Sequence, residues 1–507
     1  MTHVTGPDWT AHVPPGATAS DVDLGAGTTL PGAWRRAWEA GPRRTILSTI
    51  DGLAWSAEEL AERTSGAASL LAAGGLGAGD RLLLCAQSSV ELIVTYVAAL
   101  RLGLTVVPAN PALTDAELAA MAGAAAPSLA VLDDPSRLGD LATTTPDLAG
   151  LRQRPSKAVA PLDAADPTDV ALIIYTSGTT GRPKGVPLTH ANLLATAHAV
   201  RIAWRWDPDD RLALSLPLFH MHGLGVGLHG SLVSGAGMVL LPRFEPSAVA
   251  SAIVDGGATL FFGVPTMFHR LAASPHLADL AGLRLAVSGS APLPAELHET
   301  IRIGGGQAVL ERYGMTETGM LVSNPYDGPR RAGTVGLPLP GVELRLAERP
   351  PGVAEVEVRG PSVVRAYLDN PAATAEAFTV DGWFRTSDLG TLDEDGYLRL
   401  RGRTKELIIT GGFNVYPREV EEILRGHPGV ADAAVVGEPS PEWGETVAAY
   451  VVAADPAGTG LTAELARWCE DRLVPYKRPR RWQLVDAIPR NALGKIQRDR
   501  LADAARS

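Results

Sequence analysis

From about residue 30 to residue 400, short runs of β-branched residues alternate with Ala- and Leu-rich stretches that have a helical pattern. This alternation is typical of layered α/β domains, in which helices cover the faces of a sheet. Four runs have the composition of buried strands: residues 170–175, 211–216, 258–264 and 284–287. Thr189 is placed to cap a helix that continues through Leu193 and Leu194. We therefore predict an α/β fold with a large, multi-layered domain over residues 29–403.

The end of the chain has a different pattern. After residue 396, short strand-like runs surround two amphipathic segments at residues 417–424 and 462–473. Because 507 residues exceed what one hydrophobic core supports, we expect a second, small and mobile α+β domain over residues 404–507. The first 28 residues are rich in Thr, Gly and Pro and lack the pattern of a secretory signal, so they are expected to form a loose tail.

Charge and composition exclude several classes of partner. A formal net charge of -11 argues against a surface that neutralises nucleic-acid phosphates or anionic lipid. No stretch approaches the roughly 18 uninterrupted apolar residues of a membrane helix. Two cysteines, Cys85 and Cys469, give no disulfide framework and suit a reducing cytoplasm. We expect neither a nucleic-acid nor a membrane partner, and both a monomer and a homodimer stay open.

The loop after residues 170–175 has the densest run of hydroxyls and glycines in the chain. Glycines let backbone N–H groups surround an anion, hydroxyls add donors, and Lys184 adds a positive charge. The glycine spacing differs from the Walker pattern and Gly185 follows the lysine, so a P-loop kinase is disfavoured. The loop predicts a phosphate site made of Thr176, Ser177, Gly178, Thr179, Thr180, Gly181 and Lys184.

The same loop resembles the phosphate loop of the acyl-adenylate-forming superfamily, which includes acyl-CoA synthetases, luciferases and the adenylation domains of nonribosomal peptide synthetases. Four more segments resemble motifs of this superfamily and follow in its order: residues 311–318, 386–388, 402–406 and 491–496. The resemblance implies an ATP-dependent acid–thiol ligase that forms an acyl-adenylate and then a thioester. Its cofactors would be ATP, Mg²⁺ and coenzyme A.

The resemblance assigns nucleotide contacts to these segments. Tyr313 would pack on adenine, Thr316 would contact the α-phosphate, and Glu317 would hold Mg²⁺ through its carboxylate. Asp388 and Arg403 would contact the ribose. The other residues assigned to the nucleotide are Ser288, Gly289, Ser290, Ala291, Pro292, Glu311, Arg312, Gly314, Met315 and Lys495.

The resemblance also implies two half-reactions that are separated by a rotation of the small domain about Lys405. In the first, Lys495 would bridge the attacking carboxylate and ribose-phosphate oxygens, where positioned cations are needed. After the rotation, Gly411, Gly412 and Phe413 would line the channel for the pantetheine arm. The expected catalytic set is Lys495, Glu317, His220 and Thr176.

Residues 219–223 lie where the superfamily places the gate of the acid site, so His220 is the expected gate. An amino-acid-activating relative carries an Asp near this position, and none is present. His220, His222 and Ser288 instead suit an acid with a second polar or anionic group. Residues 219–224, 288–293 and 311–320 resemble those of malonyl-CoA synthetases, so malonate and methylmalonate are the expected acids. Met221 and Met320 would then set the pocket size.

The partner of the distal carboxylate of such a small dicarboxylic acid is less directly indicated. Arg284 is one candidate, and Arg182, Arg243 and Arg302 are alternatives. The His-Met-His sequence at residues 220–222 also allows a metal site, although no third ligand follows at a useful spacing. A core position for His222 is a further possibility.

Other activities are compatible with the same motifs. The chain could load a carrier protein in place of coenzyme A, or follow adenylate formation with an oxygenase step as luciferases do. A catalytically silent nucleotide-binding regulator is the non-enzymatic alternative. Intact Lys184, Glu317, Asp388 and Lys495 argue against the regulator, because decay would be expected there first.

Overall fold

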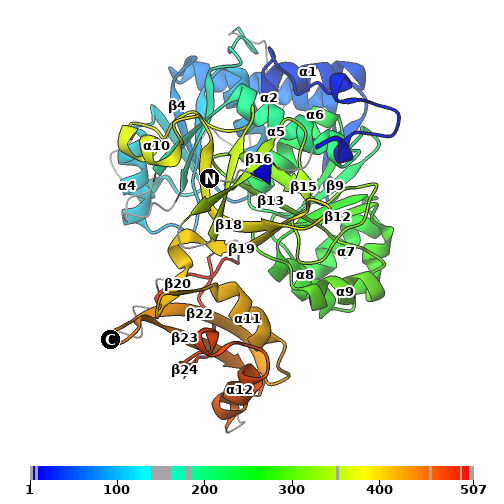
Figure 1. The fold of residues 1–507 in the computed structure, drawn as a ribbon. Coiled ribbons are helices and arrows are strands. Elements are labelled where there is room, and N and C mark those ends of the chain that lie inside the picture. Colours follow the sequence, from blue (N-terminus) through cyan, green and yellow to red (C-terminus); the bar gives the residue numbers. More distant parts are fainter. Residues whose placement is uncertain are drawn as a thin grey trace.

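The computed structural model describes residues 4–5, 9–138, 161–176, 184–349, 353–455, 460–491, 494–498 and 500–501. Two α/β sheets and one antiparallel sheet form the large domain, and a further sheet forms the small domain (Figure 1). The helices of the large domain are α1 Leu30–Ala40, α2 Ala57–Ala73, α3 Val90–Arg101, α4 Asp115–Ala125, α5 His190–Ala203, α6 His229–Ser234, α7 Pro246–Val254, α8 Pro265–Ala272, α9 Ala295–Gly304 and α10 Pro371–Ala377.

The first sheet has the order β6-β4-β5-β7-β8. Its strands are β4 Arg81–Cys85, β5 Thr105–Pro108, β6 Leu129–Leu132, β7 Val170–Thr176 and β8 Lys184–Thr189. β7 confirms the strand predicted at residues 170–175, and β8 returns antiparallel to it. Thr189 caps α5 as predicted, because its side chain accepts a hydrogen bond from the Asn192 backbone.

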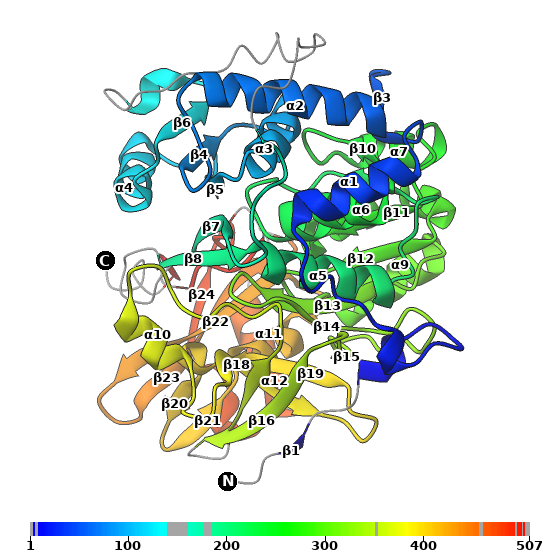
Figure 2. The same cartoon turned by 90° about the horizontal axis from the view of Figure 1, so that it is seen from above.

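The largest sheet has the order β15-β14-β13-β12-β11-β9-β10-β2-β3. Its strands are β2 Thr45–Thr49, β3 Ala54–Ser56, β9 Arg211–Leu214, β10 Gly237–Leu240, β11 Leu260–Gly263, β12 Leu285–Ser288, β13 Leu310–Met315, β14 Gly319–Ser323 and β15 Leu337–Pro338. The strands predicted at residues 211–216, 258–264 and 284–287 are present as β9, β11 and β12, each with ends shifted by one or two residues. One hydrophobic core joins this sheet to the first, with α3 buried between them (Figure 2).

The third sheet is antiparallel, in the order β1-β16-β17-β18-β19. It comprises β1 Val4–Thr5, β16 Glu343–Arg349, β17 Val353–Arg359, β18 Phe384–Leu392 and β19 Leu398–Arg403. Two described parts of the segment expected to be a loose tail, residues 4–5 and His12, are packed against the large domain. β1 pairs with β16, and His12 is fully buried with Nε2 3.2 Å from the Leu337 carbonyl. Contacts with β16 and Leu337, which are far away in the sequence, hold these residues in place. The composition of the first 28 residues does not reveal such contacts.

The small domain lies at one end of the molecule, below β18 and β19 in Figure 1. Its sheet contains β20 Ile408–Thr410, β21 Phe413–Val415, β22 Val430–Ser440, β23 Gly444–Ala453 and β24 Arg481–Leu484, and its helices are α11 Pro417–Arg425 and α12 Leu461–Glu470. α11 and α12 correspond to the two predicted amphipathic segments. This domain has a hydrophobic core of its own that includes Val420, Leu424 and Leu465. The predicted fold class is confirmed.

No helix in the described part of the chain is both long enough and apolar enough to cross a bilayer.

Candidate active site

Several of the predicted site residues gather at one edge of the largest sheet. β9, β11, β12 and β13 run parallel, so their carboxyl ends meet at the edge where open α/β sheets bind ligands. His220 follows β9, Ser288 ends β12, and Tyr313 lies near the end of β13. Ser290 has φ 71°, and Ser387 in the segment with Asp388 has φ 59°. Such left-handed serines are uncommon and cluster at functional sites.

The phosphate loop joins two paired strands. Thr176 at the end of β7 lies opposite Lys184 at the start of β8. The predicted residues between them, Ser177, Gly178, Thr179, Thr180 and Gly181, lie outside the described residues, as does Arg182. The two ends of the loop are therefore held together at the carboxyl end of β7.

Tyr367 connects the loop lysine to the expected magnesium ligand. Its hydroxyl donates to Glu317 Oε1 at 3.0 Å, and its ring centre lies 5.0 Å from Lys184 Nζ. The Leu368 backbone N–H donates to the Gly185 carbonyl at 2.9 Å, and the Val364 N–H donates to the Glu317 carbonyl at 2.9 Å. The chain around Tyr367 thus spans the distance between Lys184 and Glu317. No motif in the sequence indicated this residue.

Glu317 fits a role as a magnesium ligand. Its carboxylate is buried, and burial raises its pKa above the ordinary value. The positive charge of a bound Mg²⁺ would offset the cost of burying the ionised carboxylate. In nucleotide sites Mg²⁺ is held by one or two carboxylates and by phosphate oxygens. Tyr367 contacts both Lys184 and Glu317, so the two side chains lie in one region of the site.

Tyr313, Asp388 and Arg403 form one connected group, as expected for residues around a nucleoside. The Tyr313 hydroxyl donates to Asp388 Oδ2, and Arg403 Nε donates to Asp388 Oδ1 at 2.9 Å. Asp388 lies opposite Arg403 in the pairing of β18 with β19. The charge of Asp388 raises the pKa of the Arg403 guanidinium. Thr316, three residues after Tyr313 in the sequence, is half-buried.

The small domain brings Lys495 to the same group. The Lys495 side chain keeps solvent contact, yet partial desolvation and the positive charge of Arg403 lower the pKa of its ammonium, while Glu406 and Asp388 oppose that shift. Its neighbour Gly494 packs against α8 of the large domain, where an added Cβ would lie 3.0 Å from Thr266 Cγ2. The most distant predicted residue in the sequence is therefore within electrostatic range of Asp388 and Arg403.

A buried cation without a partner lies beside the expected acid site. Arg312 is 4% exposed, and its Nε and Nη2 have no hydrogen-bond partner among the described residues. Burial lowers its pKa to about 9. Ser288 Oγ and His222 Nε2 are also buried without partners in that part of the chain, while His222 Nδ1 lies 3.3 Å from Ser290 Oγ. Donors that lack acceptors in this arrangement indicate a missing anionic or polar ligand.

The two histidines of the site are neutral. Burial lowers the pKa of His220 to about 4, and burial, Arg312 and His220 together lower that of His222 well below its ordinary value. Both imidazoles are therefore available as neutral hydrogen-bonding groups near neutral pH. Met221 and Met320 are both buried, and Met221 packs over Gly225 of a π-helix, His222–Leu228. Such π-helical turns are frequent at functional sites.

Arg284 is not the partner of a distal carboxylate. Its Nε donates to Asp210 Oδ1 at 2.9 Å, and its Nη1 donates to the Trp204 carbonyl at 3.0 Å. It precedes β12, whereas Ser288 ends that strand, so about 13 Å of extended chain separates them. The alternation of side chains along a strand can show that two residues share a face of the sheet. It does not show that Arg284 and Ser288 lie at opposite ends of β12. Arg302 pairs with Glu299 on the exposed side of α9, and Arg243 is exposed.

Glu311 holds the turn that contains Gly289, Ser290, Ala291 and Pro292. Its two carboxylate oxygens accept from the Leu293 N–H at 3.0 Å and from the Gly333 N–H at 3.2 Å. Burial raises the pKa of Glu311 to about 7. These bonds occupy the carboxylate with backbone groups, which indicates a supporting position beside the site.

The residues expected to act in thiol transfer lie on the small domain. Lys405 is exposed in a short turn between β19 and β20. Gly411 and Gly412 have φ +56° and +81° in the turn between β20 and β21, which favours glycine. Phe413 is exposed and stacks on Tyr476 with ring centres 4.5 Å apart.

Comparison with known proteins gives a family and several relatives. The family model described as AMP-binding enzyme matches residues 34–368, and that of the AMP-binding enzyme C-terminal domain matches residues 419–495. A feruloyl-CoA synthase of Amycolatopsis sp is 38% identical over 488 residues, 92% of this chain and 97% of its own. A sulfoacetate–CoA ligase of Cupriavidus necator is 42% identical over 372 residues, 71% of this chain and 73% of its own.

Two solved structures are similar to this chain over most of its length. ATP-bound MatB from Rhodopseudomonas palustris has a TM-score of 0.88 and 38% identity, covering 95% of this chain and 99% of its own. A malonyl-CoA ligase in a ternary product complex with methylmalonyl-CoA and AMP has 44% identity but a TM-score of 0.65, covering 88% and 97%. The ATP-bound structure superposes better although its sequence is less similar. The matches confirm the predicted superfamily.

Proposed function

The chain belongs to the AMP-binding enzyme family and is an AMP-forming acyl-CoA ligase, and we propose that the acid it activates is malonate or methylmalonate. ATP, Mg²⁺ and coenzyme A are its cofactors and co-substrates.

The acid assignment rests mainly on Arg312, whose Nε and Nη2 have no hydrogen-bond partner among the described residues. An uncompensated charge in the protein interior is costly, and it persists where a ligand supplies the opposite charge. A second carboxylate could pair with Arg312, while Ser288 and the neutral His222 supply hydrogen bonds. A sulfonate, as in the substrate named for the Cupriavidus necator relative, has the same charge. Ferulate has no second anion and would leave Arg312 unpaired.

In the first half-reaction the acid attacks the α-phosphorus of ATP, and pyrophosphate leaves. Negative charge gathers at this point, so positioned cations provide most of the stabilisation. Lys184 and Lys495 are the cations we assign to this task. Mg²⁺, when bound at Glu317, neutralises the leaving pyrophosphate. Asp388 and Arg403 orient the ribose, and His220 closes the acid site beside them.

In the second half-reaction the thiol of coenzyme A attacks the acyl-adenylate and releases AMP. We assign the domain bounds 29–403 and 404–507 and a hinge at Lys405, because β19 ends at Arg403 and the next sheet begins at Ile408. Rotation there would withdraw Lys495 and present Gly411, Gly412 and Phe413. Both cysteines are free and buried, which supports a reducing, cytoplasmic location.

An acid panel tests the assignment. Malonate, methylmalonate, sulfoacetate, ferulate and propionate are supplied with ATP, Mg²⁺ and coenzyme A, and AMP and thioester are measured. We expect the highest kcat/KM with malonate or methylmalonate. Arg312→Met should lower it for those acids by about a hundredfold or more and change that for propionate by about threefold or less.

Arg302→Met is the matched control, because Arg302 has an exposed carboxylate partner on α9. This variant should leave kcat/KM for every acid unchanged. Preference of the wild type for ferulate or propionate, or an equal loss for all acids in Arg312→Met, would refute the acid assignment.

A further inference from the structure

The loop that carries Lys495 is closed by its own backbone. The Asn491 N–H donates to the Lys495 carbonyl at 2.9 Å, and the Lys495 N–H donates to Asn491 Oδ1 at 3.0 Å. Arg490 and Ile496 form an antiparallel bridge at its base. The direction of the chain at Lys495 therefore depends on how this small loop is fastened to the rest of the domain.

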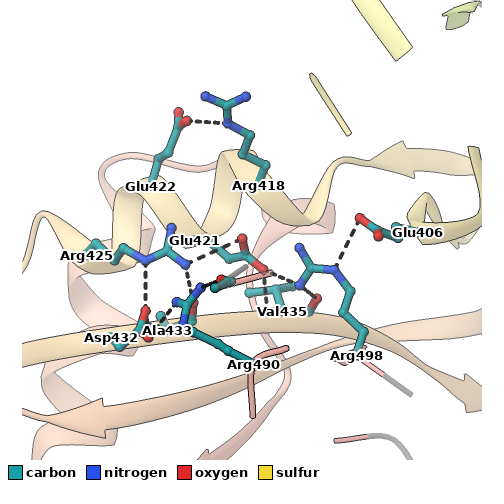
Figure 3. A network of polar contacts seen from close by, with 11 residues as sticks. Glu406, Arg418, Glu421, Glu422, Arg425, Asp432, Ala433, Val435, Arg490 and Arg498 are labelled. Atoms are coloured by element: carbon teal, nitrogen blue, oxygen red, sulfur yellow. Dashed lines mark hydrogen bonds and ion pairs between the residues drawn. The ribbon is translucent and has the colours of Figure 1, made fainter. Parts of the chain in front are cut away.

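Arg490 fastens the loop to β22. Its Nη1 donates to the Gly494 carbonyl at 2.7 Å. Its Nη2 lies 2.7 Å from Asp432 Oδ2, a contact that Figure 3 shows. The Gly494 carbonyl belongs to the peptide bond that leads into Lys495. A planar guanidinium that spans two fixed acceptors therefore sets the plane of that peptide. Asp432 is held in turn by Arg425 Nε at 3.2 Å.

Arg498 fastens the other side of the loop. Its Nη1 contacts Glu421 on α11, and its Nε lies 3.3 Å from Glu406, which follows the proposed hinge residue (Figure 3). Glu421 is 3% exposed, so loss of Arg498 would leave a buried carboxylate without this partner and would threaten the fold. Arg490 and Asp432 are partly exposed, which makes them the better positions for a test.

We propose that Arg490, held by Asp432, is a positioning residue that sets the direction in which Lys495 presents its ammonium to the nucleotide. This inference rests on the adenylate-forming role proposed for Lys495 and is independent of which acid is activated. Arg490 acts in adenylate formation, and thiol transfer proceeds without it because Lys495 is then withdrawn. A displacement of about 1 Å at a reacting centre can cost about a hundredfold in rate.

The test measures the two half-reactions separately in the full chain. Acid-dependent pyrophosphate exchange reports adenylate formation, and thioester formation from supplied acyl-adenylate and coenzyme A reports thiol transfer. The acid is whichever member of the panel the wild type uses best, so an error in the malonate assignment does not affect the result. Arg490→Met should lower exchange by about 10- to 100-fold and change thiol transfer by about twofold or less.

Four further variants sharpen the test. Arg490→Lys should restore only part of the exchange rate, because one ammonium cannot reproduce the guanidinium fork. Asp432→Asn should resemble Arg490→Met, and the double variant should be no worse than either single variant, because the two residues act as one unit. Arg481→Met removes an ion pair with Glu438 elsewhere in the same sheet and should leave both rates unchanged.

The pH profile gives an independent readout. Partial desolvation lowers the pKa of Lys495. In Arg490→Met the loop should be looser and Lys495 better solvated, so its pKa should rise. The loss of pyrophosphate exchange at alkaline pH should then occur at higher pH than in the wild type. An unmoved limb, unchanged exchange, or equal losses in both half-reactions would overturn the proposal.

Discussion

Gly289 makes room for the guanidinium of Arg312: a Cβ added at residue 289 would lie 2.4 Å from Arg312 Cζ. Because Arg312 is buried, its guanidinium cannot move into solvent to relieve this contact. The glycine therefore fixes the position of the cation that we assign to the distal carboxylate.

Gly289→Ala should accordingly displace Arg312 and raise KM for malonate by about tenfold or more. Pyrophosphate exchange supported by propionate should fall less, because propionate has no second carboxylate to pair with the Arg312 guanidinium. Steady-state kinetics with both acids checks this. Gly123→Ala is the control, since an added Cβ there meets nothing within 4 Å and should leave both acids unaffected.

Tyr367→Phe should weaken the use of Mg²⁺ because Glu317 loses the hydroxyl that orients its carboxylate. We expect the Mg²⁺ concentration needed for half-maximal exchange to rise by about threefold or more. Tyr397→Phe is the matched control, because that hydroxyl donates to the Pro329 carbonyl at 3.0 Å and should not influence Mg²⁺. An identical Mg²⁺ dependence in wild type and Tyr367→Phe would contradict the assignment of Tyr367.

Glu311 should make stability depend on pH in the acidic range. Its pKa of about 7 in the folded protein exceeds the ordinary 4.5, so its contribution is fully present below pH 4.5 and is lost as pH rises to 7. The loss is about 3 kcal/mol at most. Denaturant unfolding at several pH values should show wild type losing stability relative to Glu311→Gln over this range. Constant relative stability would contradict the raised pKa.

Met221→Ala and Met320→Ala should admit malonates with longer 2-alkyl groups. Both side chains are buried, and truncating them creates apolar space in the region that we assign to the acid. Thioester formation with 2-ethyl- and 2-butylmalonate should rise relative to malonate by about tenfold. Unchanged selectivity in both variants would exclude them as size-determining residues.

The parts of the fold that the sequence predicted are those that depend on local patterns. The Thr189 cap, the strands at β7 and β12, and the helices of the small domain follow from side-chain periodicity and capping, which neighbouring residues decide. The nucleotide motifs were recognisable because each is continuous in the chain. The packed start of the chain was missed, because His12 is held by residues hundreds of positions away.

Site residues that depend on long-range pairing were harder to assign. Arg284 immediately precedes β12, and Arg312 lies on the adjacent strand β13. Only the fold shows that the first pairs with Asp210 while the second has no carboxylate partner among the described residues. Tyr367 carries no motif, and its role follows from the approach of its loop to Glu317 and Lys184. Whether an arginine such as Arg284 or Arg312 finds a carboxylate partner is decided by tertiary packing and not by the residues next to it in the sequence.

The most direct test of the account measures both half-reactions in Lys495→Ala. We predict that acid-dependent pyrophosphate exchange falls by about a hundredfold or more, while thioester formation from supplied acyl-adenylate changes by about threefold or less. Lys477→Ala, which removes a lysine of the same domain paired with Glu419, should leave exchange intact. Retained exchange in Lys495→Ala, or equal loss of both half-reactions, would contradict the account.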